Sequence, residues 1–314
     1  MRSLTPPIFS KLEASKRVLI AGMGGGFDVY CGLPLYFALR DAGKDVFLAN
    51  LSFAFLGQAK ELCWELYEIT SSVQGLPHYF PEGYLCDWFK ERGEPVKIYA
   101  FNRTGVRTLK AAYEYLIEHL NLDTIILMDG GTDSLMRGDE AGLGTPEEDA
   151  SSLGAVSQLQ HVNKYMLCLG FGVDAFHGVC HAQVLEAIAA LTETGDYLGA
   201  WSLTPEMPEV RMYQQATEYA SERMPTHPSI VSNSILDAIS GRFGDVHRTE
   251  RTRGTELFIN PLMGLYWAFN VDAVAARNLY LPQILETNNF SVLRRIIHDF
   301  NEIRVRKDWQ VYPH

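Results

Sequence analysis

One stretch near the start of the chain constrains the fold more than any other. It reads RVLIAGMGGGFD, in which an apolar run from Arg17 leads into four glycines and an acid: Gly22, Gly24, Gly25, Gly26 and Asp28. A buried strand that passes through a glycine turn into a helix is the opening unit of a doubly wound α/β domain. Glycines at such a turn let the backbone approach a ligand closely, because no Cβ is in the way. The stretch therefore predicts a binding site at the end of the first strand.

Strand and helix patterns alternate over the first two thirds of the chain. Apolar runs predict strands at 17–22, 45–49, 96–101, 123–128, 164–170 and 197–203. Helical spacing predicts helices at 29–41, 53–70, 104–120, 145–162 and 177–191, and 71–95 is predicted as a loop. This alternation implies a mostly parallel sheet with right-handed crossovers. We therefore expect an irregular lead-in at 1–16, where Pro6 and Pro7 stand together, followed by an α/β core at 17–203.

The pattern changes beyond residue 203. Helical spacing dominates at 208–223, 228–240, 271–277 and 289–303, with a strand-like run at 256–260 and an apolar run at 262–269. No Gly/Ser/Pro-rich linker separates this part from the core. We therefore expect 204–314 to be a mainly helical elaboration packed on the same core.

The glycine stretch invites a dinucleotide-binding reading, which the sequence disfavours. Gly22 and Gly24 fit the first two positions of G-x-G-x-x-G, but Phe27 takes the third. The acid expected after the second strand is also missing, since Asn50 or Ser52 takes that place. Asp28 would repel a pyrophosphate bound at the first helix. NAD is therefore a disfavoured cofactor, and a divalent metal is compatible with the chain but not specified by it.

Charge and composition narrow the classes of partner. The chain has 314 residues and a net charge of −11, which disfavours a nucleic-acid partner. No apolar run approaches the roughly 20 residues of a membrane span, and residues 1–16 lack the apolar segment of a signal peptide. Five scattered cysteines fit a reduced, cytoplasmic setting. We expect a small-molecule ligand and leave a homo-oligomer open.

Three strand ends couple glycines with acids. The first predicted strand ends in GGGFD, the fourth in DGGTD and the fifth in GFGVD. Because parallel strands present these ends to one crevice, their acids are expected to converge on one pocket: Asp28, Asp129, Asp133 and Asp174. Three polar residues after the second and third strands are expected to join them as substrate-binding groups: Asn50, Asn102 and Arg103.

Several carboxylates in one crevice suit four kinds of chemistry. They can hold a divalent cation, bind a cationic substrate, grip ribose hydroxyls or share a proton for acid–base work. His177 and His181 are four residues apart and share a helix face, which suits either a transition metal or, for His177, proton transfer. Thr145 and Glu148 have the spacing of a capping box at the start of a helix.

These residues lead to a first hypothesis, a hydrolase or transferase that acts on a small polar metabolite. Asp129 and Asp133 act as metal ligands or acid–base groups, Asp28 orients a hydroxyl or amine, and His177 shuttles a proton. The amides of Gly24, Gly25 and Gly26 stabilise an oxyanion. The alternative is a non-catalytic protein that binds a nucleotide or metabolite, and an NAD-dependent oxidoreductase is a third, less favoured hypothesis.

Three motifs together resemble a known prokaryotic family. The motifs are GMGGGFD, DGGTDSLMRGDE and GFGVDAFHG, and the family is known only as a domain of unknown function, number eleven fifty-two. The resemblance covers roughly residues 15–310 and implies a Rossmann-like α/β fold. It brings no established reaction, so it assigns no catalytic residue to this chain.

Overall fold

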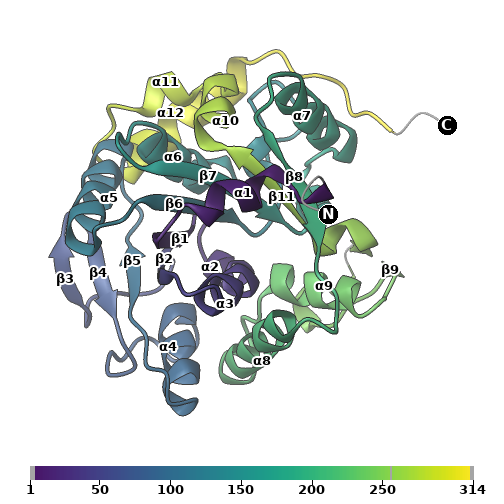
Figure 1. The fold of residues 1–314 in the computed structure, drawn as a ribbon. Helices are drawn as coiled ribbons and strands as arrows, with labels where there is room; N and C mark the ends of the chain where they lie inside the picture. Colours follow the sequence, from purple (N-terminus) through teal and green to yellow (C-terminus); the bar gives the residue numbers. More distant parts are fainter. Residues whose placement is uncertain (1–3, 255–256, 312–314) are drawn as a thin grey trace.

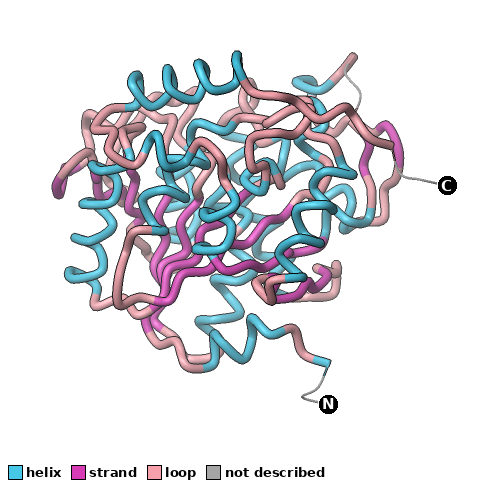
Figure 2. The backbone as a smooth tube through the Cα atoms, turned by 90° about the horizontal axis from the view of Figure 1, so that it is seen from above, coloured by secondary structure: helices cyan, strands magenta, loops and turns pink. Residues whose placement is uncertain are grey.

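A nine-stranded sheet forms the centre of the molecule in the computed structural model, which describes residues 4–254 and 257–311 (Figure 1). Its strands stand in the order β3-β4-β5-β2-β1-β6-β7-β11-β8. Their bounds are β1 (Arg17–Gly22), β2 (Asp45–Leu51), β3 (Lys60–Cys63), β4 (Leu66–Ile69), β5 (Ile98–Phe101), β6 (Thr124–Asp129), β7 (Asn163–Leu169), β8 (Tyr197–Ser202) and β11 (Leu265–Asn270). The five central strands, from β5 to β7, pair in parallel. Figure 2 shows the strands side by side from above.

Helices cover both faces of the sheet. Figure 1 shows one layer above it, made of α5 (Val106–Leu120), α6 (Pro146–Ser157), α7 (His181–Glu193), α10 (Val271–Arg277), α11 (Leu281–Ile284) and α12 (Phe290–Ile303). The layer below contains α2 (Asp28–Cys31), α3 (Leu33–Asp41), α4 (Pro81–Glu91), α8 (Pro208–Arg223) and α9 (Ile230–Ile239). The predicted doubly wound, mostly parallel α/β fold is therefore confirmed. Within the described residues, no helix is long and apolar enough to span a membrane.

Two apolar cores lie on the two faces of the sheet, and β1 contributes to both. Leu19 and Ala21 pack into the core under α5 and α6, whereas Val18 and Ile20 pack into the core with α2 and α3. All four side chains are fully buried. A strand covered on both faces reads as a continuous apolar run, which is why VLIA precedes the glycines.

The predicted helix at 53–70 is wrong, because this segment forms the β3–β4 hairpin at one edge of the sheet. Trp64 and Glu65 form the turn with positive φ angles of 41° and 65°. Such a turn matches the twist of a hairpin, and glycine or asparagine usually supplies it. The usual turn residues are missing from this turn, so no turn signal interrupts the apolar spacing, which suggested a helix.

Two segments predicted to be irregular contain helices. The predicted loop at 71–95 includes α4, and the predicted lead-in at 1–16 includes α1 (Pro7–Glu13). Each helix has a proline at its first position, Pro81 and Pro7, where the missing N–H costs nothing. Proline was therefore a start signal here rather than a barrier to structure.

The part of the chain beyond residue 203 shares the central sheet. The apolar run predicted at 262–269 includes most of β11, which inserts antiparallel between β7 and β8. The strand-like run predicted at 256–260 is described only from residue 257, where β10 (Phe258–Ile259) pairs with β9 (Gly244–Asp245). The helix α9 then begins at the carboxyl ends of the parallel strands, where Ile230 and Val231 line the site described next.

Candidate functional site

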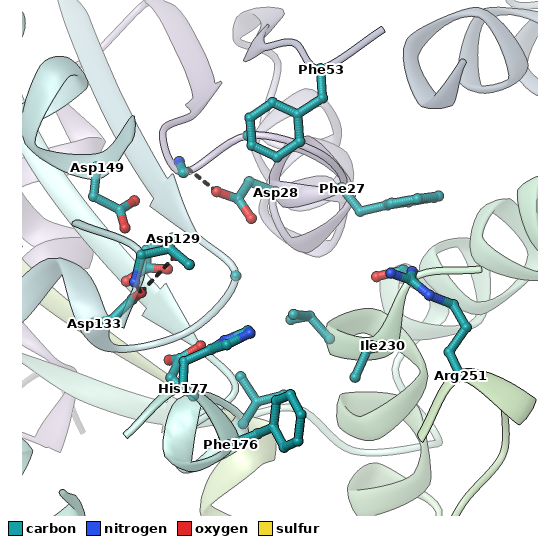
Figure 3. A pocket seen from close by; sticks show the side chains of 18 of the residues that line it. Phe27, Asp28, Phe53, Asp129, Asp133, Asp149, Phe176, His177, Ile230 and Arg251 are labelled. Atoms are coloured by element: carbon teal, nitrogen blue, oxygen red, sulfur yellow. Dashed lines mark hydrogen bonds between the residues drawn. The ribbon is translucent and has the colours of Figure 1, made fainter. Parts of the chain in front are cut away.

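A cavity of about 590 Å³ lies at the carboxyl ends of the parallel strands (Figure 3). Its acidic side chains are Asp28, Asp129, Asp133, Asp149 and Asp174. Its apolar and aromatic side chains are Phe27, Phe53, Tyr79, Val173, Phe176, Ile230, Val231 and Leu257. In Figure 3 the carboxylates lie on one wall, and Arg251 lies on the wall across from them. The cavity therefore has an acidic wall, a set of apolar and aromatic side chains, and a positive charge from Arg251 across from the acids.

Each carboxylate lies at the end of a strand or in an element that follows one. Asp28 is the first residue of α2, immediately after the glycine turn of β1, and Asp129 is the last residue of β6. Asp133 begins the short 3₁₀ helix η2 (Asp133–Leu135), and Asp174 lies in the 3₁₀ helix η3 (Val173–His177). Asp149 comes from the first turns of α6. The sheet thus gathers acids that are up to 146 residues apart in sequence.

Glycines make room for these carboxylates. A Cβ on Gly24 would lie 2.6 Å from Oδ1 of Asp149 and 2.9 Å from Oδ2 of Asp28. A Cβ on Gly131 would lie 2.5 Å from Oδ2 of Asp174. Any side chain at these two glycines would displace an acid. The glycine–acid pairing seen in the sequence is therefore a packing relationship, in which glycines from one strand end accommodate acids from another.

Hydrogen bonds hold four of the five carboxylates in place. Asp28 accepts from the Gly24 amide at 2.6 Å, and Asp174 accepts from the Thr132 amide at 2.7 Å. Asp129 accepts from the hydroxyl and the amide of Ser134. Asp133 accepts from the amide of Thr145 at 2.8 Å and from its hydroxyl at 3.0 Å. These bonds fix the orientation of the acids toward the cavity.

Burial and mutual repulsion raise the pKa of four of the acids. Desolvation is the largest cause for each, and the second is a neighbouring carboxylate: Asp129 for Asp28, and Asp133 for Asp129, Asp149 and Asp174. The pKa of Asp129 rises to about 7. A carboxyl group with a pKa near neutrality can give and take protons at physiological pH, which is the property that a general acid–base group needs.

Three of the carboxylates lie close enough to share one ligand. Oxygens of Asp28, Asp129 and Asp149 all lie within 4.8 Å of one another. Of the residues that the structure describes, no His or Cys belongs to this group. His177 is exposed at the edge of the cavity with its ring 5.3 Å from that of Phe176. His181 instead stacks on Phe171, away from the cavity lining.

Asp149 is the acid that the sequence reasoning missed. It follows the start of α6, and the residues before it suggested a capping box instead. That capping box is wrong: Thr145 donates its hydroxyl to Asp133 and caps nothing, while Glu148 lies 3.7 Å from Arg103. The sequence did contain a signal for Asp149. This acid is the fourth residue of the helix that follows the loop at the end of β6, and the start of that helix faces the same crevice.

Three predicted substrate-binding residues lie around the cavity rather than in its lining: Asn50, Asn102 and Arg103. The Asn50 amide is buried and donates to Glu82 and to the carbonyl of Gly26. Asn102 donates to Glu65, on the edge hairpin. The Arg103 guanidinium lies 5.1 Å from the Phe53 ring centroid and so supports a cavity residue from behind. Of the three glycines, Gly24 and Gly25 line the cavity.

The basic side chains of the run at 247–253 have different roles, because some form ion pairs and Arg251 lines the cavity. The Arg248 guanidinium pairs with the buried Asp237 at 2.7 Å, and His247 lies 2.9 Å from Asp245. Arg251, by contrast, lines the cavity from the 3₁₀ helix η4 (Glu250–Thr252) and donates to the carbonyl of Pro228. It places a positive charge across the cavity from the acids.

Comparison with known proteins places the chain in a family without giving it a reaction. No curated protein matches the sequence. A matching solved structure, the zinc-inhibited form of teicoplanin deacetylase Orf2, is 10% identical, with 81% of this chain and 97% of that chain covered and a TM-score of 0.36. That similarity is too low to carry an argument. The model of one family matches residues 86–304, which include the strand-end motifs after β6 and β7. The chain therefore belongs to the family described as "Protein of unknown function (DUF1152)".

Proposed function

We propose that the protein is an enzyme that catalyses hydrolysis or group transfer on a small polar metabolite. The observation that carries this proposal is the gathering of five buried carboxylates in one cavity at the strand ends. Burying like charges together costs folding free energy, so a function is the reason to keep them. The volume of about 590 Å³ is in the range of small-molecule sites.

The acids then have different roles. Asp129, with a pKa near neutrality, exchanges a proton with the substrate or with an attacking water. Asp133, held by Thr145, and Asp28, held by Gly24, orient hydroxyl or amine groups of the substrate. His177 is exposed at the rim and passes protons between the cavity and solvent. The apolar body of the substrate packs against Phe27 and Phe53.

The Asp28 carboxylate weighs against two other roles for the glycine turn, oxyanion stabilisation and NAD binding. The amide of Gly24 is engaged by Oδ2 of Asp28, so an oxyanion at that amide would compete with a carboxylate. A pyrophosphate at the start of α2 would meet the same charge, which disfavours NAD.

One observation supports an alternative function, a non-catalytic binding protein. Phe53 and Phe176 line the cavity and are 41% and 63% exposed, so they offer contact area for a ligand.

A turnover experiment distinguishes the enzyme from the binding protein. The purified protein is incubated with a small-molecule extract, and mass spectrometry follows compounds that disappear or accumulate with time. We expect turnover by the wild type and by the surface variant Asp41→Asn, and a loss of about 100-fold or more in Asp129→Asn. Retention of a compound by both wild type and Asp129→Asn in equilibrium dialysis, without conversion by either, would instead identify a binding protein.

A further inference from the structure

We propose that Asp28, Asp129 and Asp149 form a binding site for a hard divalent cation such as Mg²⁺ or Mn²⁺. The inference rests on the proposed function in placing this ion in the same cavity as its cofactor. With the ion bound, Asp129 is a ligand, so the proton exchange proposed for Asp129 applies to the ion-free protein. The three side chains come from separate parts of the fold, the start of α2, the end of β6 and the first turns of α6. One oxygen of each lies within 4.8 Å of the other two.

Asp149 supplies evidence that is independent of the clustering itself. Its side chain is 4% exposed, and among the described residues none donates a hydrogen bond to its Oδ1. Figure 3 shows this carboxylate directed toward Asp129. A buried acceptor without a partner is costly and rare in folded proteins, so it indicates a missing ligand. A cation bound among the three acids satisfies this oxygen.

Gly24 provides the space for the ion's ligands. The positions of Asp149 Oδ1 and Asp28 Oδ2 are 2.6 Å and 2.9 Å from where a Cβ of residue 24 would stand. The glycine is not in the left-handed region of φ, so the backbone does not require it there. Its role is therefore to let two carboxylates approach one another, which is useful when something positive lies between them.

The donor set selects the class of ion. All three ligands are carboxylate oxygens, and no described His or Cys joins them. Hard cations such as Mg²⁺, Mn²⁺ and Ca²⁺ prefer oxygen ligands, whereas zinc sites are usually built with His or Cys. Each of the three acids also lines the open cavity, so water or substrate oxygens can complete the shell of the ion. A magnesium ion typically keeps such positions open.

Calorimetry on the full-length protein tests the site directly. The protein is stripped with EDTA, moved to chelator-free buffer near pH 8, and titrated with MgCl₂ and with MnCl₂. We expect one ion per chain and a loss of affinity of about tenfold or more in both Asp149→Asn and Gly24→Ala. Glu147→Gln is the matched control, because it removes a charge from the same turn of α6 without touching the cavity lining, and it should bind like the wild type.

The outcomes separate this inference from the proposed function. Asp149→Asn keeps the shape of the side chain, so near-ultraviolet circular dichroism should show a folded variant even if Gly24→Ala is unstable. Absence of saturable binding, or equal affinity in the wild type and Asp149→Asn, overturns the cation site. Turnover that persists in EDTA would overturn the ion's role as a cofactor of the reaction and leave the enzyme proposal standing. Binding that Asp149→Asn abolishes, in a protein without turnover, supports the cation site alone.

Discussion

The charge of Asp129 makes the stability of the protein depend on pH in an unusual direction. In the folded protein, burial and the neighbouring Asp133 raise the pKa of Asp129 from its ordinary value of 3.8 to about 7. Between these values the folded protein binds a proton that the unfolded chain has released. The free energy of unfolding therefore falls as pH rises. The difference between the two pKa values corresponds to about 4 kcal/mol in the free energy of unfolding. This stabilisation is fully present below about pH 4 and is lost above about pH 7.

Asp129→Asn should remove the part of this pH dependence that comes from Asp129, while the other buried acids with raised pKa values, Asp28, Asp149 and Asp174, keep theirs. The amide oxygen can still accept a hydrogen bond from Ser134, although a bond to a neutral acceptor is weaker by about 1 kcal/mol. We therefore expect the variant to be more stable than the wild type by about 3 kcal/mol near pH 8 and by less than about 1 kcal/mol near pH 5. Urea unfolding in EDTA at both pH values, followed by circular dichroism, measures these differences.

The control variant replaces an exposed aspartate, so it tests whether the effect depends on the burial of Asp129. Asp41 is exposed at the end of α3, and Asp41→Asn should change the free energy of unfolding by less than about 0.5 kcal/mol at either pH. A wild type that is equally stable near pH 5 and pH 8 would refute the reasoning. So would an Asp129→Asn variant less stable than the wild type near pH 8, because Asp129 would then lie in a polar or compensated environment.

Three further predictions concern the fold around the site. The Ser229 side chain caps α9 by accepting an amide hydrogen bond at 3.0 Å, so Ser229→Ala should lower the free energy of unfolding by about 1 kcal/mol in urea titrations. Trp64 is exposed with a positive φ in the β3–β4 turn, so Trp64→Asn should raise the thermal midpoint, and a lowered midpoint would show that its ring matters more than its backbone. Arg248→Ala removes a partner of the buried Asp237 and should cost about 2 kcal/mol or more, whereas Arg253→Ala, at an exposed pair, should cost less than about 1 kcal/mol when both are unfolded in urea.

The sequence was sufficient for the core of the fold because its strands are buried on both faces. The VLIA run of β1 and the DTIILM run that contains most of β6 could be little else, and the glycine–acid ends placed Asp28 and Asp129 at one edge of the sheet. The insertion of β11 between β7 and β8 was not predictable, because strand order depends on packing between segments about 100 residues apart.

Two parts of the site were not predicted from the sequence for the same reason, namely that they depend on packing between distant segments. Asp149 lies on a helix whose start looked like ordinary capping, and only the loop from Asp133 to Thr145 brings it against Asp28. Arg251 lies in a basic run that reads as a solvated surface, and its place in the cavity depends on how the segment after α9 returns to the sheet. Local patterns identify strand ends, but they do not determine which distant segments close over them.

The central claim is that the carboxylates at the strand ends form one functional centre. The most direct measurement is a crystal structure of the protein grown with Mn²⁺, with an anomalous difference map calculated from the manganese signal. The account predicts a single strong peak among the oxygens of Asp28, Asp129 and Asp149, at bonds of about 2.2 Å. A map with no peak in this cavity, or a structure in which these three acids face different sides of the molecule, would contradict it.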